Sequence, residues 1–162
     1  MKFEIKGINS GYFRWYLIDK EKRLEFTASY LAEKDFVREF VNALSDIIKG
    51  EKEHKVEIDF ETGDIVLELK RENNNFSIIK ILNEREDNSE TEEVLFEDTM
   101  YAMRTVFVPS IRQAFAVYEK NQIKFEQYNE NWIPPFTNAE EKWGFPEKEL
   151  HNLYSVASSM QY

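Results

Sequence analysis

Three runs near the N-terminus alternate between apolar and polar residues, a pattern typical of β-strands. They cover residues 2–8, 12–18 and 24–28, and turn-forming residues lie between the first two at 9–11. The run 12–18 is apolar on both sides of the alternation, which predicts a strand covered on both faces. Because the connections are short, we expect the three strands to form an antiparallel meander.

Two helices are predicted from apolar residues at three- and four-residue spacing. The first covers residues 33–49, and Lys49 followed by Gly50 indicates its end. The second covers 99–120, and Pro109 within it predicts a kink or a division into two helices.

Residues 55–70 predict a β-hairpin whose turn lies within 61–64, where a glycine can supply a positive φ. The register expected from the alternation sets Glu57 opposite Glu68 on the polar face. Like charges directly across a ladder are mildly destabilising. Two interpretations remain open, a solvated face without a specific role and a binding site.

The next segment predicts two more strands with a loop between them. Residues 76–82 are apolar on both faces, and residues 94–96 form a short apolar run. The intervening 84–93 is rich in acidic residues and contains no apolar residue, which predicts a solvated loop.

The C-terminal part combines aromatic residues with prolines and lacks a sustained periodic pattern. A short helix is possible within 122–131, and Pro146 can begin a last helix. We expect this part to wrap over the domain with its aromatic side chains as anchors. An alternative hypothesis is a ligand pocket, in a small binding domain or an enzyme, walled by Trp132, Phe136 and Trp143.

Together these elements predict an α+β fold in a single domain over residues 1–162. Residues 1–120 would form the core and 121–162 the aromatic extension. We expect a mainly antiparallel sheet of five to seven strands, with the two principal helices packed on one face.

The charge is concentrated in one third of the chain. The 162 residues carry a net charge of −10, and residues 51–98 alone hold sixteen acidic and six basic side chains. Such a surface repels nucleic acid and anionic membranes and attracts a basic protein. An acidic surface also keeps a protein soluble without any partner. In the binding hypothesis, the acidic side chains of the hairpin and the loop bind the partner. They are Glu57, Asp59, Glu61, Asp64, Glu68, Glu86, Asp87, Glu90, Glu92 and Glu93.

Signs of catalysis are weak. The sequence contains no GxGxxG, phosphate loop, GxSxG or HExxH motif. Glu147 and His151 have a spacing that would permit metal ligation, but a single pair of this kind is common by chance. We therefore predict no catalytic residue, metal or cofactor. The absence of cysteine fits a reducing cytoplasm, and no segment has the pattern of a signal peptide or a membrane span.

A set of short landmarks resembles a group of small uncharacterised bacterial proteins. The landmarks are Ser29-Tyr30-Leu31, the helix end at Ala43-Leu44 and Gly50, Glu61-Thr62-Gly63-Asp64, Val94-Leu95-Phe96-Glu97, Phe145-Pro146 and Glu149-Leu150. The resemblance implies a lone cytoplasmic α+β domain and supplies no catalytic residue. Small acidic α+β proteins of this kind also resemble, more loosely, the immunity proteins that neutralise bacterial polymorphic toxins.

Overall fold

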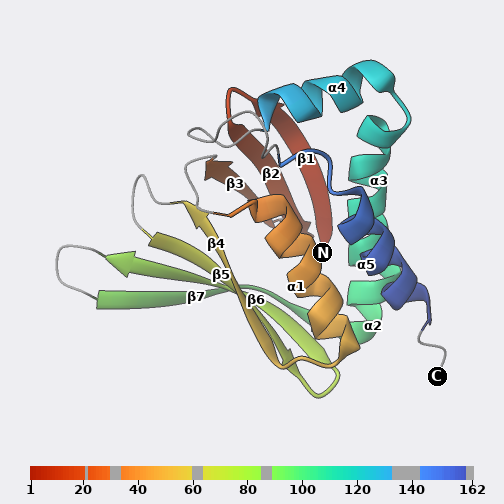
Figure 1. Cartoon of the computed structure of the whole chain (residues 1–162). Helices are drawn as coiled ribbons and strands as arrows, with labels where there is room; N and C mark the ends of the chain where they lie inside the picture. The colour runs from red at the N-terminus through yellow and green to blue at the C-terminus, as the bar shows by residue number, and fades with distance from the viewer. Residues whose placement is uncertain (21, 30–33, 60–63, 85–88, 133–142, 160–162) are drawn as a thin grey trace.

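The strands form two antiparallel sheets in a computed structural model that describes residues 1–20, 22–29, 34–59, 64–84, 89–132 and 143–159. The first sheet has the order β1-β2-β3 and the second β4-β5-β6-β7 (Figure 1). The α+β class is confirmed, and the single sheet of five to seven strands is wrong. The strands are β1 Lys2–Asn9, β2 Tyr12–Asp19, β3 Lys22–Ser29, β4 Glu53–Asp59, β5 Asp64–Glu72, β6 Asn75–Glu84 and β7 Ser89–Thr99.

The division into two sheets occurs where β3 and β4 lie next to each other without pairing. A cavity of about 210 Å³ lies between them, lined by Phe26 and Thr27 of β3 and by Ile58 of β4. At the other end of β3, the Lys22 ammonium donates to the Leu95 carbonyl of β7 at 3.2 Å. Strands β3 and β4 are therefore separated by a cavity lined by side chains and are not joined by backbone hydrogen bonds into one continuous sheet.

The helices lie on one side of the strands (Figure 1). The predicted end of α1 is confirmed, because Gly50, with a φ of 126°, closes its last turn on the carbonyls of Asp46 and Ile47. The helix begins at Phe36, later than the predicted residue 33, and Asp35 caps its first turn. The helical elements are α1 Phe36–Lys49, α2 Met100–Ala102, η1 Met103–Phe107, α3 Val108–Glu119, α4 Gln122–Asn131 and α5 Glu147–Ser159.

The core is rich in stacked aromatic rings between α1 and the first sheet. The Trp15 ring of β2 lies 5.2 Å from Phe36 and 5.3 Å from Phe40 of α1, measured between centroids. Phe3 of β1 stacks on Phe40 and, at 6.1 Å, on Phe115 of α3. These contacts hold both principal helices against the same sheet, and α5 packs on α1.

The long second helix is divided, as the proline predicts. Residues Met103–Phe107 form a π-helical turn in which the Val108 N–H donates to the Met103 carbonyl. Pro109 follows directly in the first turn of α3. Because proline has no N–H to donate, the irregular turn lies where a regular helix would lose a hydrogen bond.

The register of the β4–β5 hairpin differs from the prediction. Asp59 lies opposite Ile65, one residue away from the predicted register, and a bulge between Glu57 and Asp59 adds a second shift, so that Lys55 lies opposite Glu68 and Glu57 opposite Val66. The predicted juxtaposition of Glu57 and Glu68 is therefore wrong. The two shifts, which alternation alone does not reveal, replace a repulsive pair with an ion pair of 3.6 Å between Lys55 and Glu68.

Strand β7 is longer than the sequence suggests. The loop predicted over 84–93 is wrong for residues 89–93, which pair with β6 through contacts such as Glu93 opposite Lys80 and Glu92 opposite Ile81. Pairing with an apolar central strand thus orders a segment that has no apolar residue of its own. Within the described residues, every helix is too short or too polar to cross a membrane.

Candidate partner-binding surface

The β4–β7 sheet has a second face, which we call the outer face because it points away from α1. The inner face contributes Leu67, Leu69 and Ile78 to the main core. Side chains alternate between the two faces along a strand, so the residues next to these inner-face residues lie on the outer face. The register places them in rows that run across the sheet: Glu53–Lys70–Ser77–Glu97, Lys55–Glu68–Ile79–Val94 and Glu57–Val66–Ile81–Glu92.

The middle of the outer face is apolar. Val66, Ile79 and Ile81 occupy neighbouring positions in two of the rows and lie outside the main core cluster. Ile79 and Ile81 are nevertheless buried, at 8% and 2% exposed, and Val66 is half-buried. Val94 continues this stripe onto the edge strand and is 57% exposed. Strand β6 is therefore apolar on both sides because one side packs in the core and the other forms this outer apolar stripe.

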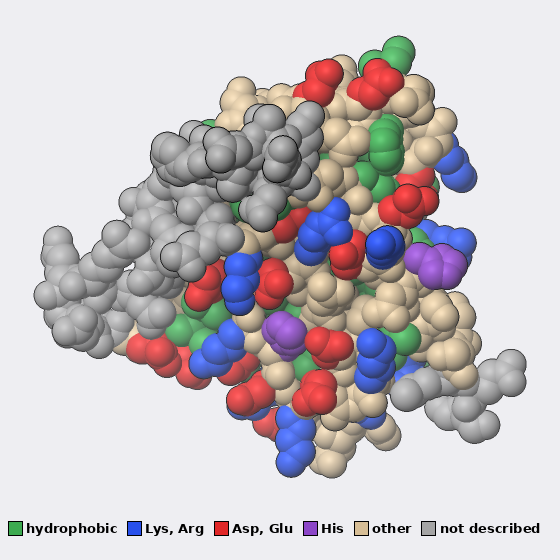
Figure 2. Space-filling view, in the orientation of Figure 1, with side chains coloured by type: hydrophobic (Ala, Val, Ile, Leu, Met, Phe, Trp, Pro, Cys, Tyr) green, Lys and Arg blue, Asp and Glu red, His purple; other side chains and the backbone are tan. Residues whose placement is uncertain are grey.

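Carboxylates surround the stripe. Six glutamates of the outer face are exposed, and none lies within ion-pair distance of a described lysine or arginine. Acidic side chains gather along the lower left border of Figure 2, over β6 and β7. The six are Glu53, Glu57, Glu72, Glu90, Glu92 and Glu97.

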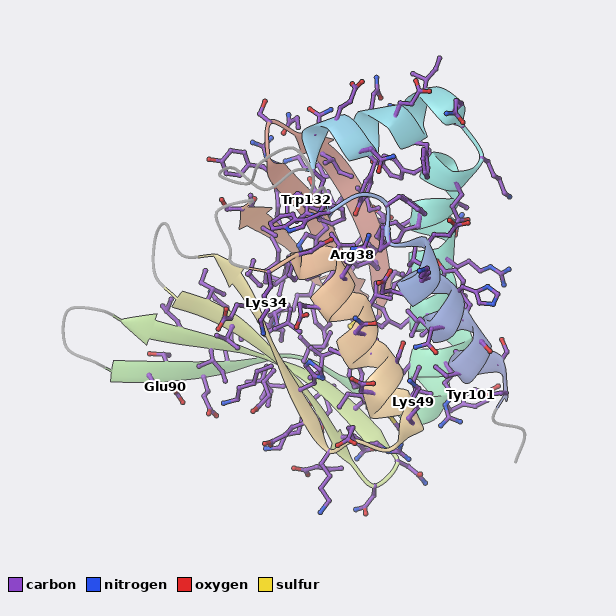
Figure 3. All side chains as sticks on the ribbon, in the orientation of Figure 1. Lys34, Arg38, Lys49, Glu90, Tyr101 and Trp132 are labelled. Carbon is purple, nitrogen blue, oxygen red and sulfur yellow. The ribbon has the colours of Figure 1, made fainter. Side chains whose placement is uncertain are left out.

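The structure brings some of the predicted binding residues together on this face. Glu57, Glu90 and Glu92 are exposed there, and Glu90 projects from the far end of β7 (Figure 3). Glu93 is also exposed but lies on the inner-face side of β7, opposite Lys80.

The other predicted binding residues have different outcomes. Glu68 is only 7% exposed and paired with Lys55, so its assignment as an open binding carboxylate is corrected. The backbones of Asp59 and Asp64 lie in β4 and β5, and their side chains are outside the description. Glu61, Glu86 and Asp87 lie outside the described residues.

Sequence reasoning missed Glu53, Glu72 and Glu97. Each lies an even number of residues from, or across the bulge in register with, an outer-face residue of its own strand. The alternation of side chains between the two faces is the signal that could have found them.

The alternative pocket loses one of its walls. Trp132 is fully buried, and its indole N–H donates to the Asp35 carboxylate at 2.8 Å. Its ring centroid lies 4.9 Å from that of Trp143, whereas Phe136 lies outside the described residues. Trp132 is thus an anchor of the C-terminal segment, in agreement with the wrapping hypothesis.

Asp35 is the centre of a buried charged cluster that the sequence did not reveal. Its carboxylate accepts from the Val37 and Arg38 N–H groups of α1 as well as from Trp132. The guanidinium of Arg38 lies 3.0 Å from Asp35 and donates to Glu149 of α5 at 2.7 Å. We call Asp35, Arg38, Trp132 and Glu149 the anchor cluster, and Figure 3 shows Arg38 and Trp132 beside α1.

The anchor cluster holds the C-terminal segment in place. Arg38 also donates to the backbone carbonyls of residues 143–145. Burial raises the pKa of Asp35, and the hydrogen bond from Trp132 opposes that effect. The pKa of the buried Tyr128 hydroxyl is raised well above its ordinary value by burial and by Asp35, so this hydroxyl stays protonated.

The remaining concave sites lie elsewhere. A groove of about 460 Å³ separates β1 from α3, and a hollow of about 420 Å³ lies beside Arg71 and Tyr101. Within the described part of the chain, no three acidic, histidine or cysteine side chains gather as metal ligands would.

Comparison of the chain with protein-family models, curated proteins and solved structures found no match. The resemblance to small bacterial proteins and to immunity proteins therefore stays a prediction, and the surface itself carries the functional argument.

Proposed function

We propose that this protein binds a basic protein through the outer face of its β4–β7 sheet. The observation that carries the proposal is the arrangement of that face, on which six exposed glutamates surround an apolar stripe that ends at the exposed Val94. Ile79 and Ile81 of the stripe are buried within the fold itself. Folding gives no reason for the 57% exposure of Val94, so we assign this end of the stripe to contact with a partner.

Electrostatics would make the encounter fast and selective. Lys55 and Lys70 are the two basic side chains in the three rows, against five carboxylates including Glu68. Such an excess of one sign steers a partner of opposite charge and repels acidic ones. Apolar contact over Val94 would then add affinity that salt does not screen.

The mechanism would be occlusion. Glutamates would pair with lysine and arginine side chains of the partner and cover the surface that the partner uses. A toxin domain that acts on nucleic acid is one partner of this chemistry, because its own substrate site must be basic. This version is the immunity hypothesis that the sequence suggests.

Charge reversal on the outer face tests the proposal. The variant Glu57→Lys/Glu92→Lys/Glu97→Lys should lose a partner that the unchanged protein captures from its native cytosol at low salt. The matched control is Glu119→Lys/Glu126→Lys/Glu130→Lys, which makes the same change in net charge at exposed positions of α3 and α4. Equal capture by both variants would remove the outer face from the proposal, since only total charge would then matter.

A further inference from the structure

The two sheets have four edges, and three of them lie beside another element of the fold. Strand β1 lies beside α3 across a groove of about 460 Å³, and the Ser110 hydroxyl accepts a hydrogen bond from the Phe3 N–H at 2.8 Å. The edges of β3 and β4 face each other across a cavity lined by side chains. The fourth edge belongs to β7, which pairs with β6 on one side and with no other described strand.

The N-terminal half of β7 is the open part of that edge. All five residues from Glu90 to Val94 are exposed, although their side chains alternate between the two faces of the sheet. The next residue, Leu95, is in contact with the first sheet, because the Lys22 ammonium of β3 donates to its carbonyl. In Figure 1 this half of β7 extends away from the helices and from the first sheet.

An open edge strand presents unpaired N–H and C=O groups that can bind a further strand. The side chains of this edge determine which strand fits. Glu90, Glu92 and Val94 share one face, and Thr91 and Glu93 share the other. An incoming strand with lysine or arginine opposite the glutamates forms favourable cross-strand pairs on both faces.

A second copy of the chain is a poor occupant. Antiparallel pairing of two β7 strands centred on Glu92 sets that glutamate against its own counterpart, and like charges directly across a ladder are destabilising. Charged side chains on an edge are a common protection against such self-association. The same glutamates that exclude a second copy favour a basic strand.

We propose that residues Glu90–Val94 of β7 accept an extended basic segment of the partner as a fifth strand of the β4–β7 sheet. This inference rests on the proposed function and states how the partner is held. Backbone hydrogen bonds would fix the segment in register, and the glutamates would select its charge.

The test uses a defined probe, a fluorescein-labelled octapeptide of alternating lysine and valine. The comparison peptide has the same side chains with every backbone N–H replaced by N–CH₃, so that it keeps its charge and cannot donate to an edge strand. We expect the unmodified peptide to bind, and the methylated peptide to bind about tenfold more weakly or less, because several backbone hydrogen bonds are lost. Amide hydrogen exchange should also slow at alternate residues of 90–94 when the unmodified peptide is bound, since only alternate N–H groups point to the open edge.

The outcomes separate the two proposals. Equal binding of both peptides, lost in Glu90→Lys/Glu92→Lys and weakened by salt, overturns strand addition and leaves the acidic face as the binding site. Binding that is unaffected by that variant and by salt overturns both. A dimer of the free protein that disappears in Val94→Lys would show that a second copy occupies the edge, which also overturns the strand-addition proposal.

Discussion

The anchor cluster and the outer face both contain carboxylates, but these differ in burial and in the partners that they have within the protein. Asp35 is 6% exposed and accepts three hydrogen bonds, from two backbone N–H groups and from Trp132. Glu57 and Glu92 are exposed and have no ion-pair partner among the described residues. The anchor charges are therefore tied to folding, whereas those of the outer face are free to act on another molecule.

This contrast shows that sequence composition cannot rank charged residues by importance. The segment 51–98 dominates the net charge, but its exposed carboxylates should contribute little to stability. The cluster that joins α1 to α5 consists of four side chains that are spread over 115 residues of the chain. The distribution of charge along the sequence therefore does not reveal it.

The largest expected effect follows from removing the central carboxylate of the anchor cluster. Asp35→Ala should lower the free energy of unfolding by about 3 kcal/mol, because it deletes the cap of α1 and leaves the indole N–H and Arg38 without their partner. Urea denaturation followed by circular dichroism measures the change. Glu39→Ala, at a partly exposed position one turn along the same helix, is the control, and an equal loss in both variants would contradict the role of the cluster.

A smaller loss is expected when only one hydrogen bond is removed. Trp132→Phe keeps an aromatic ring in the core and deletes the N–H that donates to Asp35, which should cost about 2 kcal/mol. A double-mutant cycle with Asp35→Ala isolates the interaction, since the tryptophan change should cost less once the carboxylate is gone. Strictly additive losses would show that the two side chains act independently.

The buried carboxylate should also make stability depend on pH in a distinctive direction. Because burial raises the pKa of Asp35 above its value in the unfolded chain, the folded protein binds more protons in the range between the two values. The contribution of Asp35 is then greatest below its ordinary pKa and decreases as the pH rises through the raised value. The stability advantage of the unchanged protein over Asp35→Asn should narrow in urea titrations as the pH rises above the ordinary aspartate pKa of about 4. An advantage that grows with pH would mean that the hydrogen bonds outweigh burial.

The smallest effect on folding is expected on the outer face. Glu57→Gln/Glu92→Gln should change the free energy of unfolding by less than about 0.5 kcal/mol, because neither side chain has an ion-pair partner among the described residues. Thermal unfolding at matched ionic strength would show this. A large stabilisation would indicate strong repulsion between the glutamates. The carboxylates of the outer face would then destabilise the fold, whereas those of the anchor cluster stabilise it.

The sequence predicts local elements well and long-range pairing poorly. The end of α1 at Lys49 and Gly50 and the division near Pro109 were predictable because the signals lie within a few residues. The register of β4–β5 was not, since it differs from the expected one by two residues, of which the bulge accounts for one. The length of β7 was missed for a related reason, because its acidic half is ordered by β6 and not by its own pattern.

The candidate site divides in the same way. Glu57, Glu90 and Glu92 were found from the local concentration of charge, whereas Glu53, Glu72 and Glu97 were missed. The anchor cluster depends on Trp132 meeting Asp35 across 97 residues, and no local pattern encodes such a contact. The apolar stripe was visible only as an ambiguity, a strand over 76–82 with two apolar sides.

The π-helical turn at Met103–Phe107 takes up one additional residue without changing the direction in which the rest of the long helix faces. Each residue of an α-helix turns the chain by about 100°, and in the wider π turn the Val108 N–H donates to the Met103 carbonyl five residues back, in place of a partner four residues back. The side chains that follow therefore keep the orientation of a regular helix but are numbered one position later, and those that contact Phe3 are Ser110 and Phe115. Deleting a single residue within 103–107 would restore an ordinary helix and keep this contact face against the sheet.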